Sequence, residues 1–247
     1  MTVYEGKYRI TYYDLDFRGK VKLSAILRMV HIAAEVNAND LGLGFETLQP
    51  LNISFVIQRF GLKIARMPAY NETVTIRTWP AEMARGTFIR KGDMHDAEGQ
   101  KIMEWASLWI LFDIGERKII KPQALPKEIE ITTGVDVDVK PQKVPPAGEG
   151  VPFHEHIHTV RYADVDTNIH MNNSIYGDLI GNAVFTAVEE APDWKEVQIN
   201  YLGETQFGDE IKITAYKDGE GYTVGGQANG RVSFAARIVT SEDECNG

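Results

Sequence analysis

The sequence predicts an α+β fold in which one chain contains two copies of the same unit, each an antiparallel sheet wrapped around one long helix. The segment Tyr13-Asp14-Leu15-Asp16 is matched 150 residues later by Ala163-Asp164-Val165-Asp166, and an apolar-periodic helix follows each of them. Further along, residues 70–76 (YNETVTI) are matched by residues 207–213 (FGDEIKI), at an offset of 137 residues. The same order of elements at a changing offset indicates a tandem duplication in which the first copy has one longer connecting loop.

Length and composition are those of a packed globular protein. The 247 residues suffice for one large domain or two of ordinary size, with 43% hydrophobic and 25% charged residues. We expect no membrane span, because no apolar run approaches the roughly 18 residues required, and no signal peptide. The single cysteine, Cys245, excludes a disulfide framework and fits a reducing cytoplasm. The net charge of −9 disfavours nucleic acid or an anionic membrane as the main partner.

The first forty residues indicate a strand, a polar break and a long helix. The β-prone run Tyr8–Tyr13 predicts the strand, and residues 14–19 interrupt it. From Leu23 to Ala38, apolar side chains recur at helical spacing. His31 lies in this helix, and we expect a buried or half-buried histidine with satisfied ring nitrogens rather than a catalytic one.

Apolar and alternating runs after this helix predict the strands of the first sheet. Residues 74–79 alternate with the period of two that one covered face produces. Both faces of Ile102–Phe112 are largely apolar, so we expect this strand inside the sheet. The other runs that predict strands are Leu51–Ile57, Leu62–Ile64 and Phe88–Gly92.

Prolines and charges gather between Lys121 and Pro152, where the composition shifts. Such a stretch favours a partly extended linker between two packed units. We therefore divide the chain into an N-terminal unit at residues 1–135, a linker at residues 136–152 and a C-terminal unit at residues 153–247.

Three histidines follow the linker with a spacing of two, so a strand would present all of them on one face: His154, His156 and His158. Imidazole suits zinc and copper, which leaves a metal site open. Histidines at strand ends are common, and no carboxylate pattern beyond Glu155 supports a metal, so we assign none.

The most polar stretch of the chain runs from Arg161 to Asn173 and opens onto a helix. Two carboxylates, three amides, one imidazole and one guanidinium fall within these thirteen positions. Apolar residues then recur at helical spacing from Ile175, and Asn172, Asn173 and Ser174 are of the types that cap helix N-termini. Such a terminus offers free N–H groups and a positive dipole end, which suit a developing oxyanion. These residues are also ordinary in turns, so a solvated loop is the alternative.

The spacing R-x-x-D-x-D-x-N-x-H-x-N-N-x-x-Y over residues 161–176 resembles the active-site segment of the acyl-acyl-carrier-protein thioesterases, which release fatty acids from their carrier. The resemblance covers most of the chain, including residues 55–68, 72–79 and 106–109, and is poor in the linker and the C-terminal tail. It implies a double hotdog fold, with catalysis in the C-terminal half and an acyl tunnel shaped by the N-terminal half.

The same resemblance implies four catalytic residues: Asp166, Asn168, His170 and Glu204. Thr205 stands where the plant members carry cysteine, which disfavours a covalent intermediate and favours attack by water. The first copy has Arg18 and Lys20 at the positions of the amide and the imidazole, so only the second copy carries the set.

Roles for these residues follow from the chemistry of a thioester. Either Glu204 or Asp166 would deprotonate the attacking water, and sequence order does not decide between them. Asn168 would position Asp166 or the thioester, while His170 would donate to the carbonyl oxygen or the leaving sulfur. Backbone N–H groups of residues 171–173 would complete the oxyanion site.

The function that the resemblance implies is hydrolysis of fatty acyl-acyl carrier protein to a free fatty acid and the holo-carrier, without cofactor or metal. An acyl-CoA thioesterase would use the same residues with another leaving group, and an acyl-binding protein without turnover is a further alternative. A hotdog dehydratase is disfavoured because addition of water to a double bond calls for another acid–base arrangement. Acyl carrier protein is the expected partner, and a homodimer is left open.

Three further expectations concern side chains around the site. Arg161 and Asp164 are expected to brace the loop as an ion pair. Because acyl carrier proteins are acidic, docking calls for a basic cluster, for which the candidates are Arg85, Arg90, Lys91, Arg117 and Lys118. The acyl tunnel is expected along the first helix, with walls from Ile26, Met29, Val30 and Ala33 and an end closed by Trp79.

Overall fold

A computed structural model describes residues 2–146, 148, 151–188, 192–219 and 221–241. The first copy starts with strand β1 (Tyr4–Arg9), the 3-10 turn η1 (Tyr12–Asp14), helix α1 (Leu23–Asp40), the short helix α2 (Phe45–Leu48) and the turn η2 (Gln49–Leu51). It continues with strands β2 (Ile53–Ile64), β3 (Thr73–Ala84), β4 (Thr87–His95), β5 (Lys101–Asp113) and β6 (Lys118–Ile120) and the turn η3 (Pro122–Ala124).

The second copy repeats this order. It comprises strand β7 (His154–Thr159), the 3-10 turn η4 (Tyr162–Asp164), helix α3 (Ile175–Val188), and strands β8 (Trp194–Tyr201), β9 (Glu210–Asp218), β10 (Gly221–Ala228) and β11 (Arg231–Thr240).

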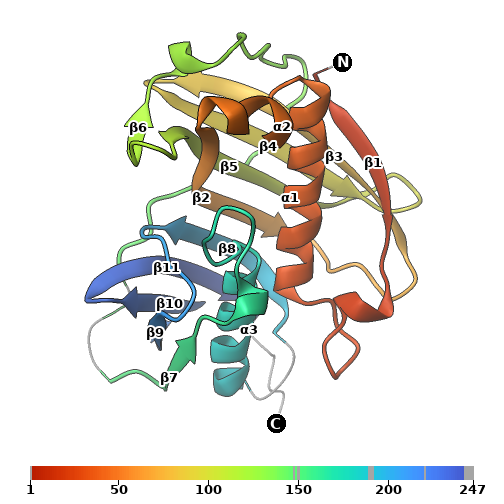
Figure 1. Ribbon diagram of the computed structural model, residues 1–247. Coiled ribbons are helices and arrows are strands. Elements are labelled where there is room, and N and C mark those ends of the chain that lie inside the picture. The colour runs from red at the N-terminus through yellow and green to blue at the C-terminus, as the bar shows by residue number, and fades with distance from the viewer. Residues whose placement is uncertain (1, 147, 149–150, 189–191, 220, 242–247) are drawn as a thin grey trace.

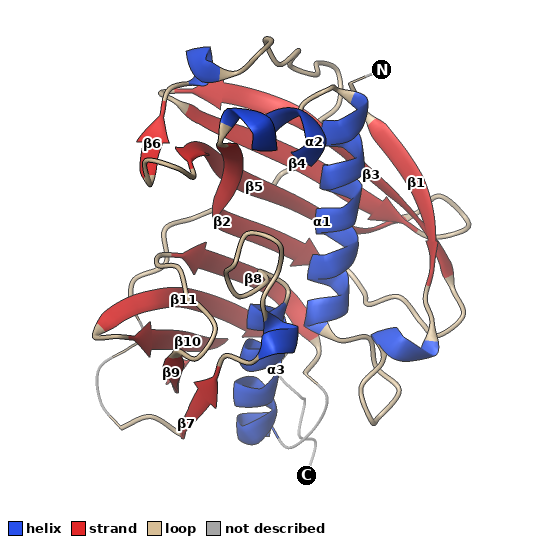
Figure 2. Cartoon of the chain, in the orientation of Figure 1, coloured by secondary structure: helices blue, strands red, loops and turns tan. Residues whose placement is uncertain are grey.

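All of these strands join into one sheet. Its order is β1-β3-β4-β5-β2-β8-β11-β10-β9-β7, with β6 paired to β5, and the pairings in the described residues are antiparallel. The helices α1 and α3 lie against one face of this sheet (Figures 1 and 2). The predicted α+β architecture, with one long helix against the sheet of each copy, is confirmed.

The two copies share one hydrophobic core. Strand β2 pairs with β8 through residues 59–63 and 196–200, so the sheet is continuous across the duplication. On the helix side, Gly177 of α3 approaches α1 so closely that an added Cβ would lie 2.8 Å from the Ser24 Cα. Buried side chains from both copies therefore belong to a single cluster, which includes Leu27, Leu62, Ile180 and Val197.

The duplication extends to the hydrogen bonds of the turn before each helix. In both copies the aspartate of the turn, Asp14 or Asp164, accepts the backbone N–H three residues earlier at 2.8 Å. The isolated bridges that close the following loops also correspond, Leu15 to Val21 and Val165 to Met171. The offset of 150 residues seen in the sequence is therefore a structural equivalence.

The predicted linker is packed against the sheet. We call residues 136–146 the strap. Gln198 and Asn200 alternate along β8 with core residues, so they project from the face remote from the helices. Gln198 Oε1 accepts the Gln142 N–H and Asn200 Oδ1 accepts the Val144 N–H, each at 2.9 Å. The strap thus covers the outer face of the sheet, while the division at residues 135 and 152 stays a prediction.

The first strand ends earlier than its composition predicts. It stops at Arg9, and the Asp14 carboxylate bonds the backbone N–H and the hydroxyl of Thr11, which turns the chain into η1. Tyr12 and Tyr13 are consequently exposed rather than paired in the sheet. The runs Leu51–Ile57 and Leu62–Ile64, by contrast, are parts of one bulged strand, β2, and the other predicted strands and helices are confirmed within a few residues.

Candidate active site

The loop that leads from η4 into α3 carries three of the four predicted site residues, and we call residues 166–172 the site loop. Backbone hydrogen bonds fold it tightly: Asp166 N–H donates to His170 O, and Ile169 N–H donates to Asp166 O, each at 3.0 Å. The carboxylate Oδ1 of Asp166 accepts the Asn168 N–H at 2.8 Å. Between Asn168 and His170, Ile169 has φ of 64°, a region that β-branched residues rarely enter.

His170 contacts Glu204 across a gap of thirty-four positions in the sequence. Its Nε2 lies 3.1 Å from Glu204 Oε2. The same oxygen binds Nη2 of Arg117, which lies in the turn between β5 and β6. The N-terminal half therefore supplies a cation to the site of the C-terminal half. When Nε2 of His170 donates to the carboxylate, Nδ1 is left as an acceptor.

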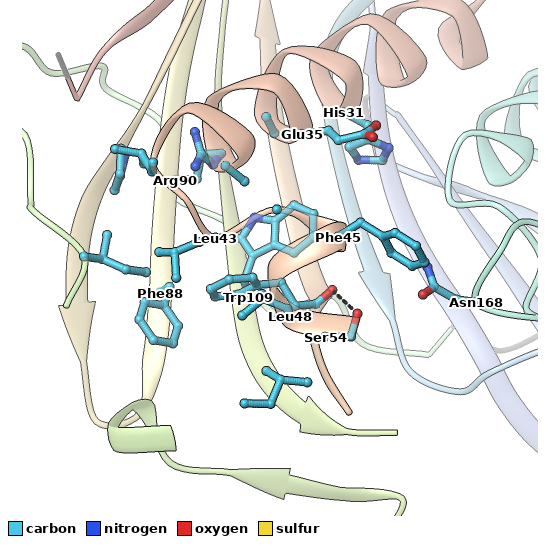
Figure 3. A pocket seen from close by; sticks show the side chains of 18 of the residues that line it. His31, Glu35, Leu43, Phe45, Leu48, Ser54, Phe88, Arg90, Trp109 and Asn168 are labelled. Carbon is cyan, nitrogen blue, oxygen red and sulfur yellow. Dashed lines mark hydrogen bonds between the residues drawn. The ribbon is translucent and has the colours of Figure 1, made fainter. Parts of the chain in front are cut away.

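A cavity of about 490 Å³ lies beside the site loop, mostly within the N-terminal half (Figure 3). Asp166, Asn168 and Asn172 line it from the site loop, while His170 and Glu204 are not among the described residues that line it. Apolar side chains dominate the rest of the wall, including Leu43, Leu48, Phe55, Phe88 and Trp109. The four predicted site residues thus form two pairs, one at the cavity and one outside it.

The side chains predicted as tunnel walls do not line this cavity, because α1 buries two faces. Its apolar stripe packs into the core shared with the sheet and α3, and this stripe contains the predicted residues Ile26, Met29, Val30 and Ala33. A different face of α1 lines the cavity, with His31, Ala34, Glu35 and Ala38. Trp79 is buried but is not among the described residues that line the cavity, whereas the adjacent Pro80 is.

His31 is buried as predicted, but its ring is not satisfied. Nε2 is buried without a hydrogen-bond partner among the described residues. The ring packs edge-on against Phe60 and Trp109, with centroids 6.3 Å apart in each case. Burial lowers the pKa of His31 to about 4, so the imidazole is neutral at pH 7.

Two of the backbone donors predicted for an oxyanion site are already used. Met171 N–H donates to Thr205 O, and Asn172 N–H donates to Asp164 O, each at 2.8 Å. The Thr205 hydroxyl is buried and lies 3.0 Å from the Tyr176 hydroxyl. Thr205 therefore ties the site loop to the end of β8, and the prediction of free N–H groups at residues 171 and 172 is wrong.

The predicted ion pair between Arg161 and Asp164 is also wrong. Asp164 Oδ2 lies 3.0 Å from His158 Nε2, and Arg161 contributes its backbone N–H. In the first copy the Tyr8 hydroxyl donates to Asp14 at 3.2 Å. In each copy, therefore, an aromatic side chain of the first strand, Tyr8 or His158, contacts the aspartate of the turn that follows.

Of the five basic residues predicted for carrier docking, four have partners within the protein. Arg90 lies in the cavity wall, and Lys91 binds Asp136 of the strap. Arg117 is bound to Glu204, and Lys118 pairs with a neighbouring glutamate. Because side chains alternate along β4, the adjacent residues Arg90 and Lys91 point to opposite faces of the sheet, one to the cavity and one to the strap.

The three histidines of β7 share one face of the strand, as predicted. His154 Nε2 and His156 Nδ1 are 2.7 Å apart, while His158 pairs with Asp164. In the described part of the chain no group of three or more His, Cys, Asp or Glu side chains is arranged to hold a metal ion, and Cys245 lies outside that part. None of the described helices combines the length and apolarity required to cross a membrane.

Two family models match almost the whole chain. The acyl-ACP thioesterase N-terminal domain matches residues 1–130, and the acyl-ACP thioesterase C-terminal domain matches residues 151–245. Among curated proteins, the chloroplastic oleoyl-acyl carrier protein thioesterase 2 of Arabidopsis thaliana is 21% identical over 84% of this chain. A chloroplastic acyl-[acyl-carrier-protein] hydrolase of Cuphea viscosissima is 22% identical over 98% of it. The chain spans 61% and 62% of the lengths of these two relatives.

Solved structures confirm the predicted double hotdog fold. An acyl-ACP thioesterase from Bacteroides thetaiotaomicron superposes with a TM-score of 0.85 at 21% identity, covering 97% of this chain and 98% of that one. The 12:0-ACP thioesterase from Umbellularia californica superposes with a TM-score of 0.81 at 17% identity, covering 98% of each chain. Because both halves match the domains of one family in order, this chain belongs to the acyl-acyl-carrier-protein thioesterase family.

Proposed function

We propose that the protein hydrolyses fatty acyl thioesters of acyl carrier protein to a free fatty acid and the holo-carrier. The observation that carries the proposal is the largely apolar cavity of about 490 Å³ that is lined on one side by Asp166 and Asn168. An acyl chain held in this cavity would bring its thioester carbonyl beside both side chains. Family membership supports acyl carrier protein as the leaving group.

Asp166 is the better-placed base of the two candidates. It lines the cavity, and among the described residues its Oδ2 has no hydrogen-bond partner. Glu204, in contrast, is bound by Arg117 and His170 outside the cavity. Asp166 would take a proton from the attacking water, and the Asn168 amide would donate to the carbonyl oxygen as negative charge develops there.

His170 would act on the leaving group. Glu204 Oε2 contacts both Arg117 and the Nε2 of His170, which orients the imidazole and leaves its Nδ1 available. In its protonated form, with the Nε2 proton held by Glu204, His170 would give its Nδ1 proton to the thiolate of the carrier arm as the carbon–sulfur bond breaks, and the proton that Asp166 took from water would later replace it. The acyl product would remain in the cavity until it dissociates.

The proposal is tested by measuring release of free fatty acid from acyl carrier protein loaded with saturated chains of several lengths, beside the matching CoA thioesters. We expect a higher kcat/KM for carrier thioesters than for CoA thioesters. An equal or higher value for the CoA substrates would identify an acyl-CoA thioesterase. Binding of acyl chains without turnover would identify a non-catalytic acyl-binding protein.

Asp166→Asn should lower kcat by about 10²- to 10⁴-fold, the range for loss of a general base, with a smaller change in KM. The first copy offers a matched control in Asp16→Asn, because Asp16 Oδ1 accepts the backbone N–H groups of Arg18 and Lys20 in the equivalent loop. This control should keep wild-type kinetics. Near-normal turnover in Asp166→Asn together with loss of turnover in Glu204→Gln would assign the base to Glu204 instead.

A further inference from the structure

A guanidinium lies in the wall of the cavity, away from the site loop. Arg90 projects from β4 beside α1, and Figure 3 shows it on the side of the cavity opposite to Asn168. Its hydrogen bonds both leave Nη1, to Asn37 Oδ1 at 2.7 Å and to Thr78 Oγ1 at 3.4 Å. Asn37 and Thr78 are buried and neutral. The group therefore sits at the far end of the cavity with neutral partners.

The charge of Arg90 has no counter-ion among the described residues. Burial lowers the pKa of Arg90 to about 10, with no carboxylate acting in the other direction, so the side chain stays protonated at neutral pH. Two glutamates, Glu35 and Glu82, also line the cavity, but neither is in ion-pair contact with Arg90. Arg90 is half-buried, and a partly desolvated cation without an anionic partner is costly, a cost that neutral acceptors offset only in part.

Most of the donors of this guanidinium remain available. Arginine carries five N–H donors in a planar fork, and the hydrogen bonds of Arg90 to described residues use Nη1 alone. The fork geometry suits an oxygen acceptor, which a guanidinium binds more strongly than a neutral donor does. A plain hydrocarbon chain would leave these donors unpaired.

The position of Arg90 in the cavity determines which part of a bound acyl chain would have to carry the oxygen acceptor. His31 and Asn37 are six residues apart on α1, which corresponds to roughly 9 Å along the helix axis. Arg90 is held at Asn37, whereas His31 lies on the same side of the view as Asn168 in Figure 3. A chain whose carbonyl sits at Asn168 therefore reaches Arg90 only with its distal part.

We propose that the cavity selects acyl chains that carry an acceptor oxygen in their distal part, as a hydroxyl, a ketone or a carboxylate, and that Arg90 is the residue that recognises it. This inference rests on the proposed function in taking the cavity to be the acyl site. The reacting thioester would still bind at Asp166 and Asn168, so recognition and chemistry lie at opposite ends of the cavity.

The test compares three chains of equal length, one plain, one with a terminal hydroxyl and one with a terminal carboxylate. Each is presented as the thioester of acyl carrier protein for kcat/KM and as the free acid for Kd by calorimetry. We expect at least one oxygenated chain to be favoured over the plain chain by about 10- to 100-fold in both measurements, as a charge-assisted hydrogen bond implies. Equal or better use of the plain chain by the wild type would overturn the proposal.

Variants separate recognition from support of the fold. Arg90→Met removes the donors and should abolish the preference while keeping or improving use of the plain chain, whereas Arg90→Lys should keep part of the preference. Lys91→Met is the matched control, because Lys91 binds the strap rather than the cavity, and it should leave the preference among the three chains unchanged. Equal losses on all three chains in Arg90→Met would show a structural role and contradict the inference. If the thioesters are not hydrolysed but the free acids show the Arg90-dependent preference, the proposed function fails and the recognition stands.

Discussion

Ile169 adopts a backbone conformation that its side chain disfavours. Its φ of 64° lies in the left-handed region, and the equivalent position of the first copy is Gly19, with φ of 77°. A β-branched residue pays roughly 1–2 kcal/mol for this conformation. The side chain is 70% exposed, so burial does not compensate. The strain sits between Asn168 and His170, where the site loop must hold both side chains in place.

Replacement of this isoleucine should therefore stabilise the protein. Asparagine tolerates the left-handed region without the flexibility of glycine, so Ile169→Asn should raise the free energy of unfolding by up to about 1 kcal/mol. Urea denaturation measures the change. Ile169→Val keeps the β-branch and should leave the free energy of unfolding unchanged. Equal stability of the two variants would contradict the inference that the backbone is strained at this position.

His31 should make stability depend on pH. Its pKa is about 4 in the folded protein, against an ordinary value of 6.5 for histidine, so well above pH 6.5 the imidazole is neutral in both states and contributes no pH dependence. Between pH 6.5 and 4 the unfolded chain binds a proton that the folded chain excludes, so folding weakens as pH falls, by roughly 3 kcal/mol in total.

The measurement is the melting temperature of wild type and His31→Gln across pH 4 to 8. Glutamine has a similar polar reach and does not titrate, so the difference between the two proteins should shrink or reverse as pH falls below 6.5. Parallel curves over the whole range would contradict a buried neutral imidazole at this position.

The sequence marks the residues of the candidate site, but it does not show how they are grouped in space. The fixed spacing of Asp166, Asn168 and His170 marks them, yet strand and loop geometry decides that the first two line the cavity and the third faces Glu204. Arg117 arrives from the other copy, 87 positions away from Glu204 along the chain. A tertiary contact of that length leaves no local pattern.

At the scale of elements, the crossing of α1 and α3 depends on one glycine. An alanine at position 177 would place its Cβ 2.8 Å from the backbone of Ser24. Gly177→Ala should therefore destabilise by about 1–3 kcal/mol, although alanine favours helices, because two backbones must separate. Gly181 lies one turn later with nothing within 4 Å of an added Cβ.

Gly181→Ala is thus the matched control and should stabilise by up to about 1 kcal/mol through helix propensity. The melting temperatures of Gly177→Ala and Gly181→Ala test this expectation. A gain in both would mean that the two helices have room at their crossing.

Helices and strands were predictable because apolar residues recur along the sequence with the period of each element. The elements that differ from the prediction do so for physical reasons. The apolar stripe of α1 correctly marks a buried face, but a helix with two buried faces gives no signal for which one borders a cavity. The strand predicted to reach Tyr13 ends at Arg9 because the Asp14 carboxylate captures the backbone of Thr11, and composition does not reveal this turn.

At the scale of the whole molecule, the strap fastens the outer face of the sheet through buried amides. Asn200 accepts the Val144 N–H at 2.9 Å and donates to Gln142 O at 2.8 Å. Asn200→Val should cost about 1–3 kcal/mol for each backbone group left without a partner, and should open residues 136–146 to limited proteolysis. If Asn200→Val unfolds at the wild-type midpoint and its residues 136–146 resist the protease as before, the hydrogen bonds of Asn200 do not stabilise the strap.

The matched loops of the two copies have a consequence for how such a protein can change over time. Residues 16–21 and 166–171 share one backbone path but carry different side chains, a basic pair in one and an amide with an imidazole in the other. Two identical subunits related by symmetry would have to accept every substitution twice, once at each loop. Fusion into one chain removes that constraint, so one loop can keep the proposed catalytic side chains while the opposite half is free to change the walls of its cavity.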